Sequence, residues 1–232
     1  MSKRQLFCFT HAGGTKDFFE LIDNDLSGID VVKIEYAGHG ERRKESFYQN
    51  FDELADDVFQ TVKAKLKGEY ALFGYSMGSI ALVEVLKRII DLRLPLPEHV
   101  FLAAHEPHAK SELLGFAEDE LDLWVKNRTI KFGAVPEKLI HNNVFWRTYL
   151  PVYRADYSII GKYNFSSLDL KLDIPATIFY SETDTPFIEM KKWERFFPCE
   201  YYSFEGTHFF IQQHHKEMAE IIATRVGGIH DV

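Results

Sequence analysis

The sequence predicts an α/β fold, with a mostly parallel central sheet flanked by helices and one helical insertion. Three observations carry this prediction. Short apolar runs of strand length alternate with amphipathic runs of helical length, which is the pattern of parallel strands joined by right-handed crossovers. A Gly-x-Ser-x-Gly pentapeptide lies between one such strand and the helix that follows it. The alternation stops between about 108 and 170, where only helical patterns occur.

The elements follow one another along the chain in strand–helix order. The first strand, 6–9, reads LFCF and is wholly apolar, as expected of a strand buried on both faces. The same apolar pattern predicts later strands at 31–36, 70–73, 99–104, 174–180 and 199–204. Apolar residues at helical spacing predict helices at 16–26, 51–66, 80–92 and after residue 208. The strand-free stretch contains three further amphipathic pieces, at 113–127, 137–150 and 152–163.

Length and composition favour one globular domain. The chain has 232 residues, of which 46% are hydrophobic and 27% charged, so a single domain over 1–232 can bury a large core. The segment at about 108–170 is too long for one crossover and is interpreted as a lid inserted into that domain. We expect a monomer.

Charge and apolar patterning exclude several classes of partner and location. A net charge of −8 gives no global attraction to nucleic acid or to an anionic membrane. No apolar run approaches the ~20 residues that a membrane span requires. Two cysteines far apart in sequence fit a reducing compartment, and the N-terminal residues contain no signal-peptide pattern. The expected location is therefore the cytoplasm.

Residues 74–78, GYSMG, form the most informative motif. They place Ser76 on a tight strand-to-helix turn, where small residues two positions away on either side avoid a steric clash. The N-terminus of the following helix directs unpaired N–H groups at the same point. Ser76 is the predicted nucleophile of an acyl-transfer enzyme; the alternative is a glycine-bounded turn with an idle serine.

A serine nucleophile needs a base, and the base needs a carboxylate to orient it. In the α/β-hydrolase arrangement these follow the serine in the order acid, then histidine, each on a loop after a late strand. Asp184 follows the strand at 174–180, and His208 follows the strand at 199–204 within a Gly-x-His turn. The predicted catalytic residues are therefore Ser76, Asp184 and His208, with Glu182 as the rival acid.

The oxyanion formed during acyl transfer must also be stabilised by backbone N–H groups. One donor is predicted to be Met77, the residue after the nucleophile, and the other Ala12, in the loop after the first strand. His11 is the neighbouring alternative to Ala12. His39 has no partner that the sequence identifies, whereas His105 and His108 follow a strand and are expected to line the pocket. Because no metal-ligand spacing or dinucleotide fingerprint occurs, we expect neither a metal nor a cofactor.

Six segments together resemble the type II thioesterases, stand-alone α/β-hydrolases that accompany nonribosomal peptide and polyketide synthases. The segments span the chain and are LFCFTHAGG at 6–14, AGHGERR at 37–43, YALFGYSMG at 70–78, PVYRADY at 151–157, Asp184 with Trp193 downstream, and GTHFF at 206–210. The sequence departs from the family's usual residues at Thr10, His11, Ala37, His39 and Tyr75, and none of these belongs to the predicted triad.

The resemblance implies hydrolysis of acyl groups from the phosphopantetheine arm of a carrier protein, for editing or for product release, without a cofactor. The partner it implies is an acyl-loaded carrier protein. Two basic clusters are candidate docking sites, namely 42–44 and the lid residues Lys126, Arg128 and Lys131, although either can equally be a solvated charged face. Two other functions remain open: a stand-alone carboxylesterase or lipase acting on small esters, and an inactive hydrolase-fold binding protein.

Overall fold

A computed structural model of the protein describes residues 3–108 and 117–226. Six strands form one sheet in the order β2-β1-β3-β4-β5-β6. They are β1 (Gln5–Phe9), β2 (Asp30–Lys33), β3 (Tyr70–Tyr75), β4 (His99–Ala103), β5 (Ala176–Tyr180) and β6 (Cys199–Ser203). Neighbouring strands in this sheet all run parallel. Because parallel strands end at the same edge, the loops that follow them meet there.

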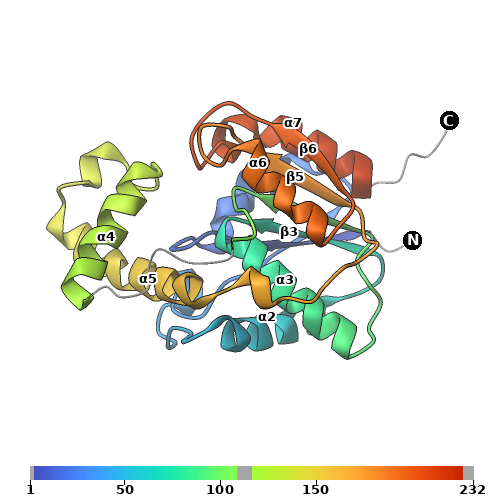
Figure 1. The fold of residues 1–232 in the computed structure, drawn as a ribbon, viewed down its shortest axis with the longest axis horizontal. Helices are drawn as coiled ribbons and strands as arrows, with labels where there is room; N and C mark the ends of the chain where they lie inside the picture. Colours follow the sequence, from blue (N-terminus) through green and yellow to red (C-terminus); the bar gives the residue numbers. More distant parts are fainter. Residues whose placement is uncertain (1–2, 109–116, 227–232) are drawn as a thin grey trace.

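Helices cover both faces of the sheet (Figure 1). α1 (Glu20–Asp25) and α7 (Ile211–Val226) lie on one face, and α2 (Phe51–Lys65) and α3 (Met77–Asp91) lie on the other. Successive side chains of β1 point to opposite faces of the sheet, which explains why both faces are covered. Leu6 and Cys8 pack into the core under α1 and α7, whereas Phe7 and Phe9 pack into the core under α2 and α3. The predicted α/β fold with a parallel sheet is confirmed.

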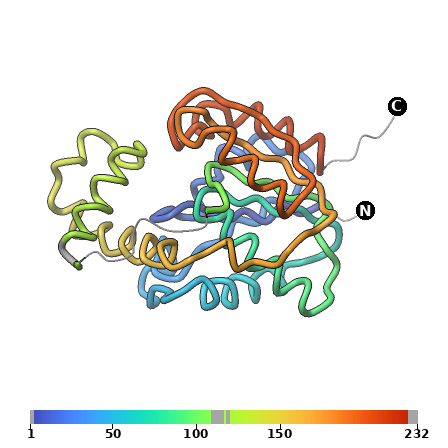
Figure 2. Tube along the Cα trace, in the orientation of Figure 1, coloured from blue at the N-terminus to red at the C-terminus, as the bar shows by residue number. Residues whose placement is uncertain are grey.

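The region at 108–170 is helical where it is described. It contains α4 (Glu118–Lys131) and α5 (Asn143–Lys162), which pack on each other, and the described part has no strand. Figure 2 shows that α4 stands apart from the sheet and that α5 runs from α4 back to it. The start of the helical piece predicted at 113–127 lies outside the described residues.

Short elements complete the chain. The 3-10 turns are η1 (Lys16–Phe19), η2 (Gly40–Arg42), η3 (Glu137–Leu139), η4 (Phe165–Ser167) and η5 (Lys191–Arg195), and η5 directly follows the short helix α6 (Phe187–Met190). Among the described helices, none has the length and hydropathy of a bilayer crossing. Within residues 3–108 and 117–226, no three His, Cys, Asp or Glu side chains gather closely enough to hold a metal ion.

Several predicted boundaries differ from the structure, and two of the differences have a clear physical reason. The second strand ends at Lys33 rather than at residue 36. Ile34 N–H still donates to the Cys8 carbonyl oxygen at 3.0 Å, but β1 ends at Phe9, so residues 35 and 36 lie beyond the end of their partner strand. The helical pieces predicted at 137–150 and 152–163 are largely one helix, α5, which continues through Pro151. The carbonyl that Pro151 leaves without a helical donor belongs to Arg147, an exposed residue, so water can satisfy it.

Candidate active site

Ser76 lies in a strained turn between β3 and α3. Its φ of 55° and ψ of −118° fall outside the regions that side-chain-bearing residues normally occupy. A Cβ added to Gly74 would come within 2.5 Å of the Gly78 carbonyl oxygen, and one added to Gly78 would lie 1.9 Å from the Phe9 carbonyl oxygen. Both glycines are therefore required by the available space, as the motif predicts.

His208 links Ser76 to a carboxylate. Its Nε2 lies 2.9 Å from Ser76 Oγ, and its Nδ1 lies 2.9 Å from Asp184 Oδ2 and 3.0 Å from Oδ1. Because a carboxylate only accepts, Nδ1 carries the proton, and Nε2 can accept from the Ser76 hydroxyl. Glu182, the rival acid, is exposed and accepts a hydrogen bond from Phe187 N–H at 3.3 Å. The structure thus brings Ser76, His208 and Asp184 together and leaves Glu182 outside.

Hydrogen bonds hold the two loops that carry the acid and the base. The Tyr75 hydroxyl donates to the His208 carbonyl oxygen at 2.6 Å. The Ser181 and Thr183 hydroxyls both donate to the Gly206 carbonyl oxygen, at 2.5 and 2.6 Å. These bonds tie the loop after β5 to the loop after β6, so the separation of Asp184 and His208 does not depend on the triad's own contacts.

The two backbone amides predicted to bind the oxyanion lie at the same edge of the sheet. Met77 is the first residue of α3, and Ala12 is in the loop after β1. The close approach of Gly78 to the Phe9 carbonyl brings the ends of these two elements together. Neither N–H donates a hydrogen bond to another part of the chain that the structure describes, as is usual for the first residue of a helix. Both amides are therefore available to a ligand.

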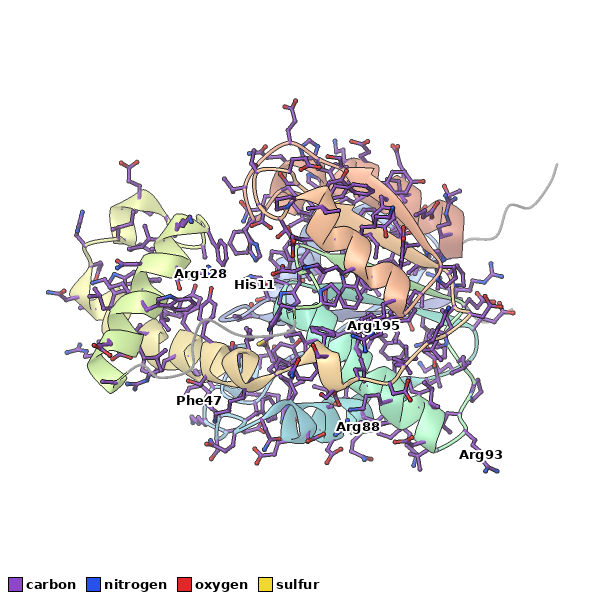
Figure 3. All side chains as sticks on the ribbon, viewed as in Figure 1. His11, Phe47, Arg88, Arg93, Arg128 and Arg195 are labelled. Atoms are coloured by element: carbon purple, nitrogen blue, oxygen red, sulfur yellow. The ribbon has the colours of Figure 1, made fainter. Side chains whose placement is uncertain are left out.

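His11, the alternative to Ala12, has a packing role. Its Nδ1 donates to the Ala12 carbonyl oxygen at 2.8 Å, and its ring packs edge-on against Phe18 and Phe209, with centroids 4.5 and 4.8 Å away. Burial lowers the pKa of His11 to about 3, so the ring is neutral. Figure 3 shows His11 on the side of the main body that faces α4.

A buried ion pair close to Ala12 was missed by the sequence analysis. Asp156 Oδ2 accepts a hydrogen bond from Gly13 N–H at 2.7 Å and lies 2.9 Å from His39 Nε2. The sequence identified no partner for His39, and the structure provides one in Asp156. A signal was available, because Asp156 belongs to the 151–157 segment that resembles a family signature, but nothing in its spacing indicated a contact with His39.

A cavity of about 270 Å³ opens beside Ser76 and His208. Loops after β4 and β5 form one side of it, and α4 and α5 form the other. Residues lining it include His105, His108, Trp124, Arg128, Phe132 and Tyr157. The positions of His105 and His108 agree with the sequence prediction. A separate cavity of about 290 Å³ lies between α2, α3 and α5, and its lining includes none of the predicted site residues.

The end of α4 covers His208. The Phe132 ring stacks on the imidazole with centroids 4.2 Å apart and planes 15° apart. The Arg128 guanidinium lies 4.6 Å from the Phe132 ring centre and 5.3 Å from that of Trp124. These three residues are spaced by four and share one side of α4, and Figure 3 shows Arg128 on the side that faces the sheet. The end of α4 thus forms part of the surroundings of His208, the predicted base.

Several known proteins that are similar in sequence and fold are thioesterases. A profile of the thioesterase domain family matches residues 4–226. The gramicidin S biosynthesis protein GrsT of Aneurinibacillus migulanus is 24% identical over 97% of this chain and 90% of its own. The medium-chain S-acyl fatty acid synthase thioesterase of Rattus norvegicus is 26% identical over 92% and 83%.

Solved structures agree with this assignment. The type II thioesterase BorB from the borrelidin biosynthetic cluster superposes with a TM-score of 0.81, at 27% identity over 97% of this chain and 93% of BorB. The α/β-hydrolase fold and the resemblance to type II thioesterases are both confirmed. Because the family profile spans almost the whole sequence, the chain belongs to the thioesterase family and is a hydrolase of acyl thioesters.

Proposed function

We propose that this thioesterase removes acyl groups from the phosphopantetheine arm of a carrier protein, through a covalent intermediate on Ser76. The observation that carries the proposal is the hydrogen-bonded series Ser76–His208–Asp184 at a strained turn, within a chain of the thioesterase family. Two of the similar proteins, GrsT and BorB, are named for the biosynthesis of gramicidin S and borrelidin, which supports a carrier-bound substrate.

The first half-reaction transfers the acyl group to the enzyme. His208 Nε2 takes the Ser76 proton while Oγ attacks the thioester carbonyl carbon. Asp184 holds the Nδ1–H and stabilises the imidazolium that forms. The tetrahedral oxyanion receives hydrogen bonds from the N–H groups of Met77 and Ala12. The C–S bond then breaks, and the imidazolium gives its proton to the departing thiolate, which leaves as the phosphopantetheine thiol.

The second half-reaction frees the acid. His208 Nε2 takes a proton from water, whose oxygen attacks the acyl carbon, and a second tetrahedral oxyanion forms in the same place. Collapse breaks the bond to Ser76 Oγ, which recovers its proton from the imidazolium. The products are a carboxylic acid and the enzyme in its starting state, so the cycle requires no cofactor.

We further infer that 108–170 is a lid within a single domain spanning 1–232. The cavity beside Ser76 supports this inference, because α4 and α5 supply one of its sides. The Phe132 ring on His208 supports it too, since it excludes water from the base. An acyl chain bound in this cavity would lie between the lid and the loops after β4 and β5.

The carrier protein must dock through a local patch, because both partners are acidic if carriers have their usual charge. In the cluster 42–44, Arg42 already pairs with Glu45 at 2.5 Å and with Asp57 at 2.6 Å. Lys131, at the end of α4, is exposed and stands close to the lining of the cavity. The position of Lys131 next to Phe132, which lines the cavity, favours Lys131 as a docking residue.

The test compares one acyl group in two linkages. Wild-type enzyme is given an acyl-carrier thioester and the matching small oxygen ester, and kcat/KM is measured for each. We expect the thioester to be strongly preferred. A large preference for the oxygen ester would make the protein an esterase, and carrier binding without turnover would make it a binding protein.

A Ser76→Ala variant tests the mechanism in the same assay. We expect kcat to fall by about 10⁴-fold or more while carrier binding is retained, because the hydroxyl that attacks is gone. Mass spectrometry of wild-type enzyme quenched during turnover should locate the acyl group on Ser76. Turnover by the variant at the wild-type rate would exclude the covalent route.

A further inference from the structure

In the loop that carries Ala12, one peptide group is hydrogen-bonded through both its N–H and its C=O. The Gly13 N–H donates to Asp156 Oδ2 at 2.7 Å, and the Ala12 carbonyl oxygen accepts from His11 Nδ1 at 2.8 Å. These two groups are the N–H and the C=O of the peptide bond between Ala12 and Gly13. Rotating this peptide would break both bonds and leave polar groups unpaired in a partly buried site, which is costly.

Helix α5 contacts this peptide a second time through Tyr153. Gly13 has a φ of +73°, and a Cβ placed on it would lie 2.0 Å from Tyr153 Cε1. Tyr153 precedes Asp156 by three residues, so both side chains lie on the same side of α5. The helix therefore contacts Gly13 with an aromatic ring and with a carboxylate.

The Asp156 carboxylate pairs with His39 in a buried site. The side chains of Asp156 and His39 are 4% and 1% exposed, so an isolated carboxylate there would be strongly destabilised. His39 Nδ1 lies 3.0 Å from the Ala37 carbonyl oxygen, and Nε2 lies 2.9 Å from Asp156 Oδ2. Because both partners accept hydrogen bonds, both ring nitrogens carry protons and His39 is an imidazolium.

We propose that Asp156, paired with His39, is a positioning residue that orients the Ala12–Gly13 peptide so that the preceding N–H, that of Ala12, faces the oxyanion. The inference rests on the proposed function, in which Ala12 is an oxyanion donor. Asp156 touches neither the substrate nor the reacting atoms. It acts through the Gly13 amide, and the charge of the pair strengthens that hydrogen bond.

The expected effect is a loss of transition-state stabilisation without a loss of substrate binding. Removing one oxyanion donor typically lowers kcat by about 10²–10³-fold. For Asp156→Ala we expect a fall in kcat of about 10²-fold with KM unchanged, since the Ala12 donor is misplaced rather than removed. Asp156→Asn keeps an oxygen that can accept from Gly13, so it should recover part of the lost kcat.

Two further measurements separate positioning from general damage. An alkylboronic acid adds to the serine hydroxyl as a tetrahedral adduct, whereas a thioether analogue of the substrate mimics the ground state. Asp156→Ala should lower the affinity for the boronic acid and leave the affinity for the thioether unchanged. In NMR hydrogen exchange, the Gly13 amide should exchange faster in Asp156→Ala than in wild type, because its acceptor is gone.

Glu84→Gln is the matched control. The Glu84 side chain is also 4% exposed and pairs with Lys87 and Arg88, but it lies on α3 and lines the cavity that contains no triad residue. It should lower Tm without changing kcat, boronic acid affinity or Gly13 exchange. If Asp156→Ala does not fold, Asp156→Asn must by itself show lower kcat at unchanged KM and faster Gly13 exchange.

The outcomes distinguish this inference from the function on which it rests. Wild-type kcat and wild-type Gly13 exchange in the Asp156 variants would overturn it, and so would equal losses of boronic acid and thioether affinity. Those results would leave the proposed function intact, provided that Ser76→Ala is inactive. Full turnover by Ser76→Ala would instead remove the proposed function itself.

Discussion

The role of the Asp184 carboxylate can be tested by replacing one of its oxygens with an amide nitrogen. Asp184→Asn keeps the shape of the side chain, but its amide can donate to His208 Nδ1 and so favours the wrong tautomer. We expect kcat to fall by about 10⁴-fold with little change in folding, as measured by thioester hydrolysis and thermal unfolding.

Glu182→Gln is the control for this substitution, because Glu182 lies two residues away and bonds only to the Phe187 backbone among the described contacts. It should hydrolyse thioesters at nearly the wild-type rate. If Glu182→Gln were the more damaging change, the acid of the triad would have to be reassigned.

His39 makes stability depend on pH. Burial opposes its charge, but the Asp156 carboxylate outweighs burial and raises the pKa of His39 above its usual 6.5. Because the folded state binds this proton more tightly than the unfolded state, the stabilisation is complete below about pH 6.5 and is lost as pH rises through the raised pKa. Glu35 adds to the shift, and Tyr36, whose ring lies 5.8 Å away, packs against the imidazole.

Comparison with His39→Gln isolates this effect. Urea unfolding is measured for both proteins at several pH values, and the advantage of wild type should shrink as pH rises above 6.5. Three other histidines act in the opposite sense below pH 6.5, because burial lowers the pKa values of His11, His99 and His105. They act below pH 6.5, outside the range in which the advantage of wild type is lost, so they do not disturb the comparison at higher pH. A difference independent of pH would mean that His39 is not charged in the fold.

At the scale of elements, the C-terminal end of α4 places Phe132, the residue that follows the helix, against His208. Phe132→Ala removes the ring that stacks on His208 at the edge of the cavity. We expect thioesters with bulkier acyl groups to gain in kcat/KM relative to short ones, because the cavity widens. Losing the aromatic pair should lower the free energy of unfolding by about 0.5–1.5 kcal/mol, and losing the partly buried area of the ring should lower it further.

Phe145→Ala provides the control, because Phe145 lies on α5 and does not line the cavity. Its ring packs edge-on against Trp146 and at a tilt against Tyr149. It should leave the order of acyl preference unchanged. Equal shifts in acyl preference in both variants would argue against a specific role for Phe132.

The elements whose boundaries depend on apolar periodicity were predictable, and those that depend on tertiary contacts were not. The strand at β3 and the helix α2 follow from their own residues. The end of β2 depends on where its neighbour β1 stops, which no local pattern reports. Pro151 predicted a break in α5, but tertiary packing on both sides of it keeps the helix continuous.

The candidate site shows the same division. Ser76, Asp184 and His208 were predictable because each lies just after a strand, in a fixed chain order. The pair Asp156–His39 was not, because it joins residues 117 positions apart, on a helix and a loop that no shared strand aligns. The stacking of Phe132 on His208 likewise depends on how the helical region folds back, which the sequence does not encode locally.

At the scale of the whole molecule, the sheet separates the two cysteines. Cys8 lies on β1 and Cys199 on β6, with β3, β4 and β5 between them, a distance of about 19 Å at the usual strand spacing. A disulfide needs Cα atoms within about 7 Å, and both cysteines are free in the structure. Burial raises the pKa of Cys8 well above its usual value and that of Cys199 to about 11.

Thiol titration with an aromatic disulfide reagent checks this arrangement. The folded protein should react slowly, because the thiolate fraction is low at both positions, and the protein in denaturant should release two equivalents at once. Cys199→Ser should release one. Fewer equivalents in the unreduced, denatured wild type would mean that a disulfide exists after all.

One helix, α5, connects α4 to the surroundings of the nucleophile. α5 has 20 residues and is about 30 Å long, with Trp146 near its start and Asp156 near its end. A single residue inserted between them would rotate one half about 100° against the other. Insertions and deletions in related sequences should therefore occur in the connection between α4 and α5, at 132–142, where they do not change the register of α5. Anyone grafting a foreign cap onto this scaffold should splice ahead of Asn143 and keep the register of the helix intact.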